Sequence, residues 1–229
     1  MLATSVTGPL VWIGFIGVGV VGWIARRRKL RAEEQSIEGW AASHGYPQTD
    51  VVLGRTPVLS AVGGDPGPAF AVPIGDRTGA LFPFSYTIGA GRDSKDVDTT
   101  VVQVDAPPGV PPFRVVPREG SDVPDRTYGE EEMELESIEF QRDHQLLVER
   151  GADRTALERL FDPPTIVWFI NQGSAAPVVE YADATLAVVA RSCCMTGTDC
   201  EALLGQAQYL TTRLDAVAAA PLPDSPTTA

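Results

Sequence analysis

Residues 80–106 read ALFPFSYTIGAGRDSKDVDTTVVQVDA, and this stretch decides the fold. Apolar residues alternate with small or polar ones from Phe82 to Ile88, which predicts a half-buried strand with one apolar face. The segment GAGRDSKD that follows is turn chemistry, and a second β-prone run occupies 98–106. The connection is too short for a crossover helix, so the two strands are predicted to pair antiparallel.

The same pattern continues on both sides of this stretch. Further β-prone runs occupy 55–62, 69–74 and 113–117, and Gly, Pro and Asp residues separate them. An acidic, turn-rich segment at 119–137 is predicted to be a solvated loop. The alternating run at 138–149 predicts one more strand.

Helix signals are concentrated in the last third of the chain. Asp153 is placed to cap a short helix through Leu160, and Asp162 before Pro163 marks the start of a second helix that is predicted to be largely buried. A hairpin is predicted around 182–184. Thr198 and Glu201 have the spacing of a capping box, and a long helix with one apolar stripe follows them.

Strands and helices are therefore segregated along the chain. This order predicts an α+β fold, with antiparallel strands packed against a few helices, for a domain over residues 46–220. Residues 221–229, PLPDSPTTA, are predicted to be a disordered tail.

Residues 1–25 precede this domain and carry no charged side chain. Within them GVGVVG, 17–22, matches the glycine pattern of dinucleotide-binding turns. The second strand and acidic residue that such a site needs about 20 residues later do not follow. The run has the length needed to cross a bilayer, with Trp12 and Trp23 near its ends. We predict a single-pass transmembrane helix.

Five basic residues follow the span directly: Arg26, Arg27, Arg28, Lys29 and Arg31. The positive-inside rule then predicts that the N-terminus is outside the cell and that the domain is cytoplasmic. A signal peptide carries its positive charge before the apolar core, so cleavage and secretion are the less favoured alternative. The five residues are predicted to lie at the membrane surface, against anionic lipid headgroups of the bilayer.

The five basic residues form a basic collar. Together with a predicted juxtamembrane amphipathic helix that ends at Gly45, this collar makes up residues 26–45. Within the span, Gly14, Gly17 and Ala25 project to a similar side, on which another membrane protein could pack.

All 30 acidic residues follow residue 31, and the net charge is −12. An acidic domain disfavours nonspecific nucleic-acid binding, so no nucleic-acid partner is predicted.

Three stretches carry a resemblance to a known group of proteins: Trp40–Tyr46, Ser85–Thr87 and Glu139–Pro163. With them the chain resembles a family of uncharacterised membrane-anchored proteins from high-GC Gram-positive bacteria, the actinobacteria. These proteins join an N-terminal span to a soluble domain of unknown function. The resemblance covers most of the chain after residue 38. It implies no activity and no catalytic residues.

A few residues are candidates for chemistry. Glu130, Glu131 and Glu132 could bind a divalent cation, although a charge run more often serves solubility. His44 and His144 are isolated in sequence, and a structural role is more common than a catalytic one for a lone histidine.

The three cysteines, Cys193, Cys194 and Cys200, lack the spacing and the fourth ligand of a structural zinc site. Their number and crowding also make a poor disulfide framework, so reduced thiols are predicted. No catalytic, cofactor-binding or metal-binding residue is predicted, and no cofactor.

The sequence favours a membrane-anchored protein whose cytosolic domain is a binding or scaffold module at the inner face of the membrane. The alternative is a membrane-tethered hydrolase or transferase that uses Asp and Glu chemistry. That alternative requires two carboxylates that converge beside a pocket.

Overall fold

The computed structural model describes residues 37–51, 56, 59, 62–89, 94–119, 129–173, 176–191 and 196–220. The predicted span 1–25, the five basic residues from Arg26 to Arg31 and the predicted tail 221–229 lie outside the described residues. Among the described residues, no helix combines the length and the apolar character needed to cross a membrane.

The described strands form one sheet, and every pairing in it is antiparallel. In spatial order the strands are β1 (Gln48–Thr49), β3 (Ala69–Ile74), β4 (Arg77–Ile88), β5 (Lys95–Asp105), β10 (Thr185–Val189), β9 (Val178–Ala182), β6 (Phe113–Pro117), β8 (His144–Glu149) and β7 (Glu130–Glu132), with β2 (Asp65–Pro66) paired to β4. The predicted antiparallel α+β fold is confirmed.

The runs predicted to pair antiparallel through short connections are neighbours in β3, β4 and β5, whereas the last of these runs, β6, pairs with β8 and β9. β4 and β5 pair from Gly79 opposite Val104 to Ile88 opposite Lys95. Gly79 is required here, because a Cβ atom at this position would lie 2.9 Å from the Gln103 carbonyl oxygen. The predicted hairpin is also present as β9 and β10, which turn through Asp183 and Ala184 at φ of 48° and 54°.

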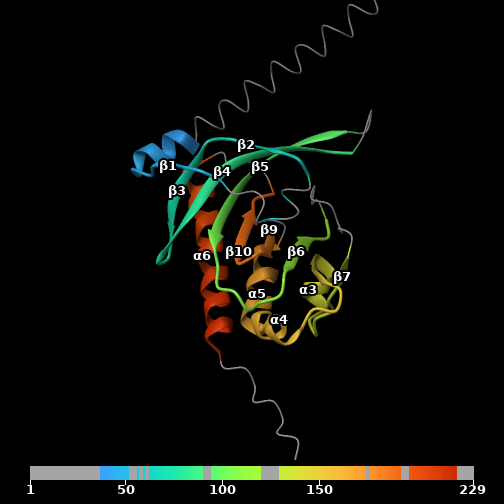
Figure 1. The fold of residues 1–229 in the computed structure, drawn as a ribbon. Helices are drawn as coiled ribbons and strands as arrows, with labels where there is room; N and C mark the ends of the chain where they lie inside the picture. Colours follow the sequence, from blue (N-terminus) through green and yellow to red (C-terminus); the bar gives the residue numbers. More distant parts are fainter. Residues whose placement is uncertain are drawn as a thin grey trace, which may run out of the picture.

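The helices cover one face of this sheet (Figure 1). They are residues 37–43, α3 (Ile138–Asp143), α4 (Thr155–Leu160), α5 (Pro163–Gln172) and α6 (Gly197–Ala219). The long helix α6 packs on β3, β5 and β10. Its buried stripe is Leu203, Ala207, Leu210 and Leu214, as its 3.6-residue period predicts.

The opposite face of the sheet is also buried. Phe82, Phe84 and Tyr86, which were predicted to share one apolar face, belong to a second apolar cluster on this side, and Ile88 packs against it. Leu81, which precedes that alternation, faces the helices. Leu59 joins this second cluster, and Val62 packs against it. Thr56, Leu59 and Val62, the described residues of the strand predicted at 55–62, are not in a strand.

The prediction of a single strand over 138–149 is wrong for its first half. Residues 138–143 form α3, and only 144–149 form β8. The Ser137 side chain accepts a hydrogen bond of 3.2 Å from the Phe140 amide and so caps α3. The predicted capping box also lies elsewhere: Thr196 and Asp199 form it, two residues before Thr198 and Glu201.

The described sheet ends in two short edges. β1 contributes two exposed residues at one edge, and β7 contributes three consecutive glutamates at the other. Short and charged edge strands offer few backbone groups to a foreign strand.

A cluster of aromatic rings joins the short helices to the sheet. Phe169 of α5 is fully buried, and its ring centroid lies 5.8 Å from that of Phe140 on α3 and 6.0 Å from that of Phe161 after α4. Phe113 of β6 adds an edge-on contact with Phe161 at 5.5 Å. Aromatic pairs at these separations stabilise beyond the area they bury.

We predict that Phe169→Ala lowers the free energy of unfolding by about 3–5 kcal/mol, because it opens a cavity that rigid neighbours cannot fill. Urea denaturation measures this difference. Val167→Ala on the same helix is the matched control, since Val167 is 52% exposed, and it should change stability by less than about 1 kcal/mol. Equal effects of the two substitutions would contradict the packing described.

Candidate functional site

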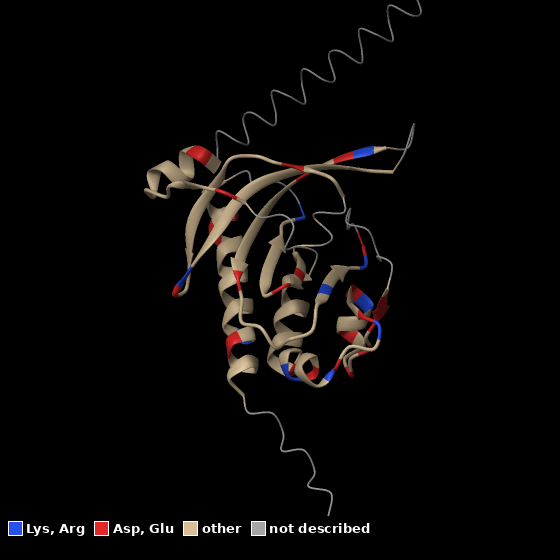
Figure 2. Cartoon of the chain, in the orientation of Figure 1, with Lys and Arg blue, Asp and Glu red and all other residues tan. Residues whose placement is uncertain are grey.

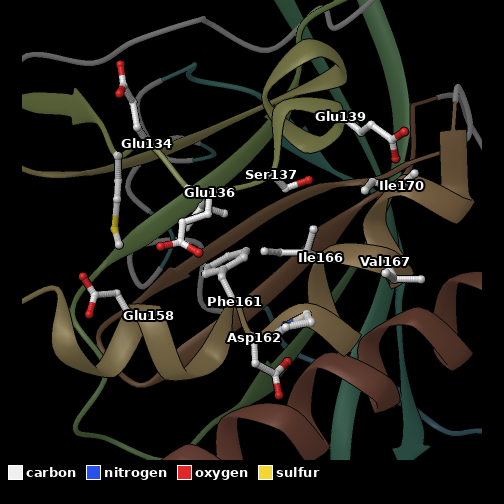
Figure 3. A pocket seen from close by; sticks show the side chains of 13 residues that line it. Glu134, Glu136, Ser137, Glu139, Glu158, Phe161, Asp162, Ile166, Val167 and Ile170 are labelled. Carbon is white, nitrogen blue, oxygen red and sulfur yellow. The ribbon is translucent and has the colours of Figure 1, made fainter.

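A groove of about 700 Å³ opens between α3, the end of α4 and α5. Residues 133–137 and Glu139 line one wall, and residues of the first two turns of α5 line the other. In Figure 3, Phe161 and Ile166 occupy the middle of this groove, between the 134–139 segment and α5. The groove is the best-formed candidate for a binding site in the part of the chain that the structure describes.

The floor of the groove is apolar. Its apolar residues are Met133, Leu135, Phe161, Ile166, Val167 and Ile170. The helix α5 exposes more of this surface than its sequence predicts, since Ile166 and Ile170 are half-buried and Val167 is exposed. The prediction of a largely buried second helix is therefore wrong for the side of α5 that borders the groove.

The rim of the groove is acidic. Its carboxylates come from Glu134, Glu136, Glu139, Glu158 and Asp162, and no Lys or Arg is among the described residues that line it. The four glutamates are all exposed. Figure 2 shows that charged residues of both signs gather around α3, α4 and β7, at the end of the molecule that holds the groove.

Asp162 has a structural role at the base of the rim. Its carboxylate accepts a hydrogen bond of 3.1 Å from the Thr165 amide, which caps α5 as predicted, and it binds the Arg213 guanidinium of α6. Burial acts to raise the pKa of Asp162, but the hydrogen bonds from Thr165 and Arg213 outweigh it, and the pKa lies below its usual value. Asp162 therefore holds a negative charge and joins α5 to α6.

The three consecutive glutamates of β7 are engaged by arginines. Glu130 accepts hydrogen bonds of 3.3 and 2.7 Å from Arg114, Glu132 binds Arg118, and Glu131 lies 2.6 Å from Arg154. Within the described part of the chain, no three His, Cys, Asp or Glu residues converge as metal ligands do. The glutamates act in ion pairs that hold β7 to its neighbours.

Arg114 is the most buried of these charges, with 1% of its side chain exposed. It lies on β6 opposite Glu180 of β9, a buried acidic residue. A guanidinium at this depth depends on hydrogen-bonded carboxylates for its stability.

The two histidines lie in different environments. His44 is exposed, and its Nδ1 lies 2.8 Å from the Trp40 carbonyl oxygen at the end of the first described helix. His144 is buried, with its ring 5.1 Å from that of Phe140, and neither ring nitrogen has a hydrogen-bond partner among the described atoms. Burial lowers the pKa of His144 below 6.5, against the opposing effect of Asp143. The structure therefore places His144 in the core as a neutral ring.

Cys200 lies on α6 and is buried in the main apolar cluster. Cys193 and Cys194 lie outside the described residues, as do the five basic residues predicted to contact lipid headgroups. The structure thus neither brings these predicted residues together nor separates them.

The groove itself was not predicted from the sequence. Its two walls come from segments about 25 residues apart in the sequence. Taken separately, the first predicts an acidic loop and the second predicts a buried helix. The available signal was the sequence MELESIE at 133–139, in which acidic and apolar residues alternate before a Ser that caps a helix. That alternation places the glutamates on the rim and the apolar side chains below it.

Comparison with known proteins shows a likeness of fold. No family model and no curated protein matches the chain. Among solved structures the chain is similar to the mycobacterial trehalose monomycolate transport factor A, TtfA, with a TM-score of 0.56 and 15% identity. The match covers 85% of this chain and 99% of that chain. At this identity it shows a shared fold over nearly the whole length of TtfA.

We predict that Glu130→Ala lowers the free energy of unfolding by about 3 kcal/mol, because it leaves the buried Arg114 with a carboxylate missing. Glu131→Ala is the control, since its partners Arg150 and Arg154 are 76% and 47% exposed, and it should cost less than about 1 kcal/mol. Thermal and urea unfolding of both variants measure the difference. Similar losses would show that Arg114 does not depend on Glu130.

We also predict a pH dependence from His144. Its pKa is lowered in the folded state, so the unfolded chain binds more protons below pH 6.5, and stability falls as the pH drops from about 7 to about 5. Urea titrations across this range measure the slope. His144→Leu removes the titrating group and should flatten it. An unchanged slope would mean that another group causes the pH dependence.

Proposed function

We propose that this protein is a membrane-anchored binding module with its domain on the cytoplasmic side, which acts as an accessory component of a membrane-linked process. The groove of about 700 Å³, with its exposed apolar floor, carries the proposal. Apolar surface that a fold leaves open and surrounds with polar groups is typical of a binding site.

The predicted anchor places this groove at a membrane. Residues 1–25 have the length and composition of a span, and the basic residues from Arg26 to Arg31 favour contact with anionic headgroups on the cytoplasmic side. Acidic side chains of the domain are repelled by the same headgroups. The domain is thereby held off the bilayer surface, and the groove stays open to a partner.

The likeness to TtfA supports a transport-linked role as part of the proposal. TtfA is a transport factor by name, and it shares the fold of this chain over nearly its whole length. Because a fold by itself does not determine function, the likeness supports this role together with the groove and the predicted anchor.

The hydrolase or transferase alternative finds less support in the groove. A catalytic acid there would need a carboxyl group that holds its proton near neutral pH. Asp162, at the base of the rim, has a lowered pKa and is occupied by Thr165 and Arg213. The exposed glutamates of the rim suit charge recognition instead.

We predict that the full chain sediments with membranes and resists carbonate extraction, whereas a chain that lacks residues 1–31 stays in the supernatant. Deletion of residues 221–229 is the control and should leave the protein in the membrane. Protease added to inside-out vesicles should digest the domain, because the domain faces the cytoplasm. Carbonate release of the full chain, or a native N-terminus beyond Arg31 by mass spectrometry, would refute the anchor.

A further inference from the structure

The groove between α3 and α5 combines two features that point to one kind of partner. The first is apolar exposure. Val167 of α5 lines the groove and is 52% exposed, and Ile138 of α3, which is 83% exposed, follows the lining residue Ser137 at the edge of the groove without lining it. Contact of these apolar side chains with water is unfavourable because of the hydrophobic effect. A partner that covers them removes that contact.

The second feature is unbalanced negative charge. Glu134, Glu136 and Glu158 make no ion pair with another described residue, although the neighbouring β7 glutamates are all engaged by arginines. Like charges gathered on one rim repel one another, and a cationic partner relieves that repulsion. The rim therefore selects for positive charge around an apolar centre.

The shape of the groove favours a helix as the partner. It is bounded by α5 on one side and by the 133–139 segment on the other, and its volume accommodates several large side chains rather than a whole domain. Amphipathic helices bind such grooves through apolar side chains at i, i+3, i+4 and i+7, with polar residues at the margins.

The charge of the rim decides between the kinds of occupant. Anionic lipid headgroups are repelled by the rim carboxylates. A partner protein that presents basic side chains around an apolar surface satisfies both the apolar floor and the charge. The first described helix, residues 37–43, lies at the opposite end of the molecule from α4, which borders the groove (Figure 1).

We propose that the groove binds a cationic amphipathic helix of a partner protein, whose apolar side chains cover Val167 and Ile166 while its Lys and Arg residues meet Glu134, Glu136, Glu139 and Glu158. This inference rests on the proposed function as a binding module and names the chemistry of what is bound.

The test uses the full chain in phosphatidylcholine nanodiscs, with empty nanodiscs as the reference. The probe is a synthetic helix of about four turns, with Leu at i, i+3, i+4 and i+7 and Lys elsewhere. A helix with Glu in place of Lys and a scrambled Lys–Leu peptide are the controls. Fluorescence anisotropy should show saturable binding of the Lys–Leu helix and none of the two control peptides. The affinity should fall as the salt concentration rises from about 50 to about 500 mM.

Two groove variants locate the binding. Glu134→Gln with Glu136→Gln should weaken it about three- to tenfold and reduce its salt dependence. Val167→Asp should weaken it about tenfold or more by placing a charge on the floor. Asp76→Asn with Glu201→Gln removes two exposed charges elsewhere and should leave the affinity within about twofold. Circular dichroism and thermal unfolding confirm that each variant is folded.

Three outcomes overturn the inference: no binding above empty nanodiscs, equal binding of the scrambled or Glu–Leu peptide, or binding that the groove variants do not weaken. Binding of the helix to the full chain without nanodiscs is measured in the same way. A chain that proves not to be anchored in membranes is thereby distinguished from a groove that does not bind the helix.

Discussion

The aromatic packing around Phe169 is the interaction on which the groove depends. α3 and α4 have six residues each, too few for a helix to persist alone in water. Each is held by a ring that enters the same cluster, Phe140 from α3 and Phe161 from the end of α4. On α5, Phe169 is buried in this cluster, whereas Val167 is exposed to solvent in the groove. The same helix therefore fixes the wall of the groove and provides its exposed apolar surface.

The acidic residues of the domain serve two different purposes within a short distance along the chain. On β7 they are matched to arginines, one of which, Arg114, lies deep in the sheet. From Glu134 onward the same residue type stands on the groove rim without arginines among the lining residues. The contrast arises from topology, since β6 and the start of α4 bring Arg114, Arg118 and Arg154 to β7. At the rim, α6 brings Arg213 to Asp162, and no described Lys or Arg is among the residues that line the groove.

Sequence patterns predicted the fold class because the turn residues and the strand period are local signals. β3 and β6 match the predicted runs at 69–74 and 113–117, and the hairpin of β9 and β10 lies where predicted. The prediction of one strand at 138–149 failed because the alternating pattern there spans two elements. The Ser137 side chain caps a helix at 138–143, and the strand begins only at 144. For α6 the helix and its apolar stripe were predicted, but its capping box was placed two residues late, because the Asp199 side chain accepts a hydrogen bond from the Thr196 amide and makes Thr196 the cap.

The groove lay beyond prediction for a different reason: it is made by contact between separate segments. Neither the sequence of 133–139 nor that of 158–170 indicates by itself that its apolar side chains remain partly exposed. Whether Val167 is covered depends on the placement of α3, and that placement follows from ring packing with no periodic signature in the sequence.

The two short edges of the sheet have a consequence for how copies of this protein behave when crowded. A strand of two exposed residues and a strand of three glutamates leave almost no backbone for a second sheet to continue. The side chains of β7 are in addition held in ion pairs with arginines of the same chain. Crowded copies of the domain therefore have little tendency to continue one another's sheet.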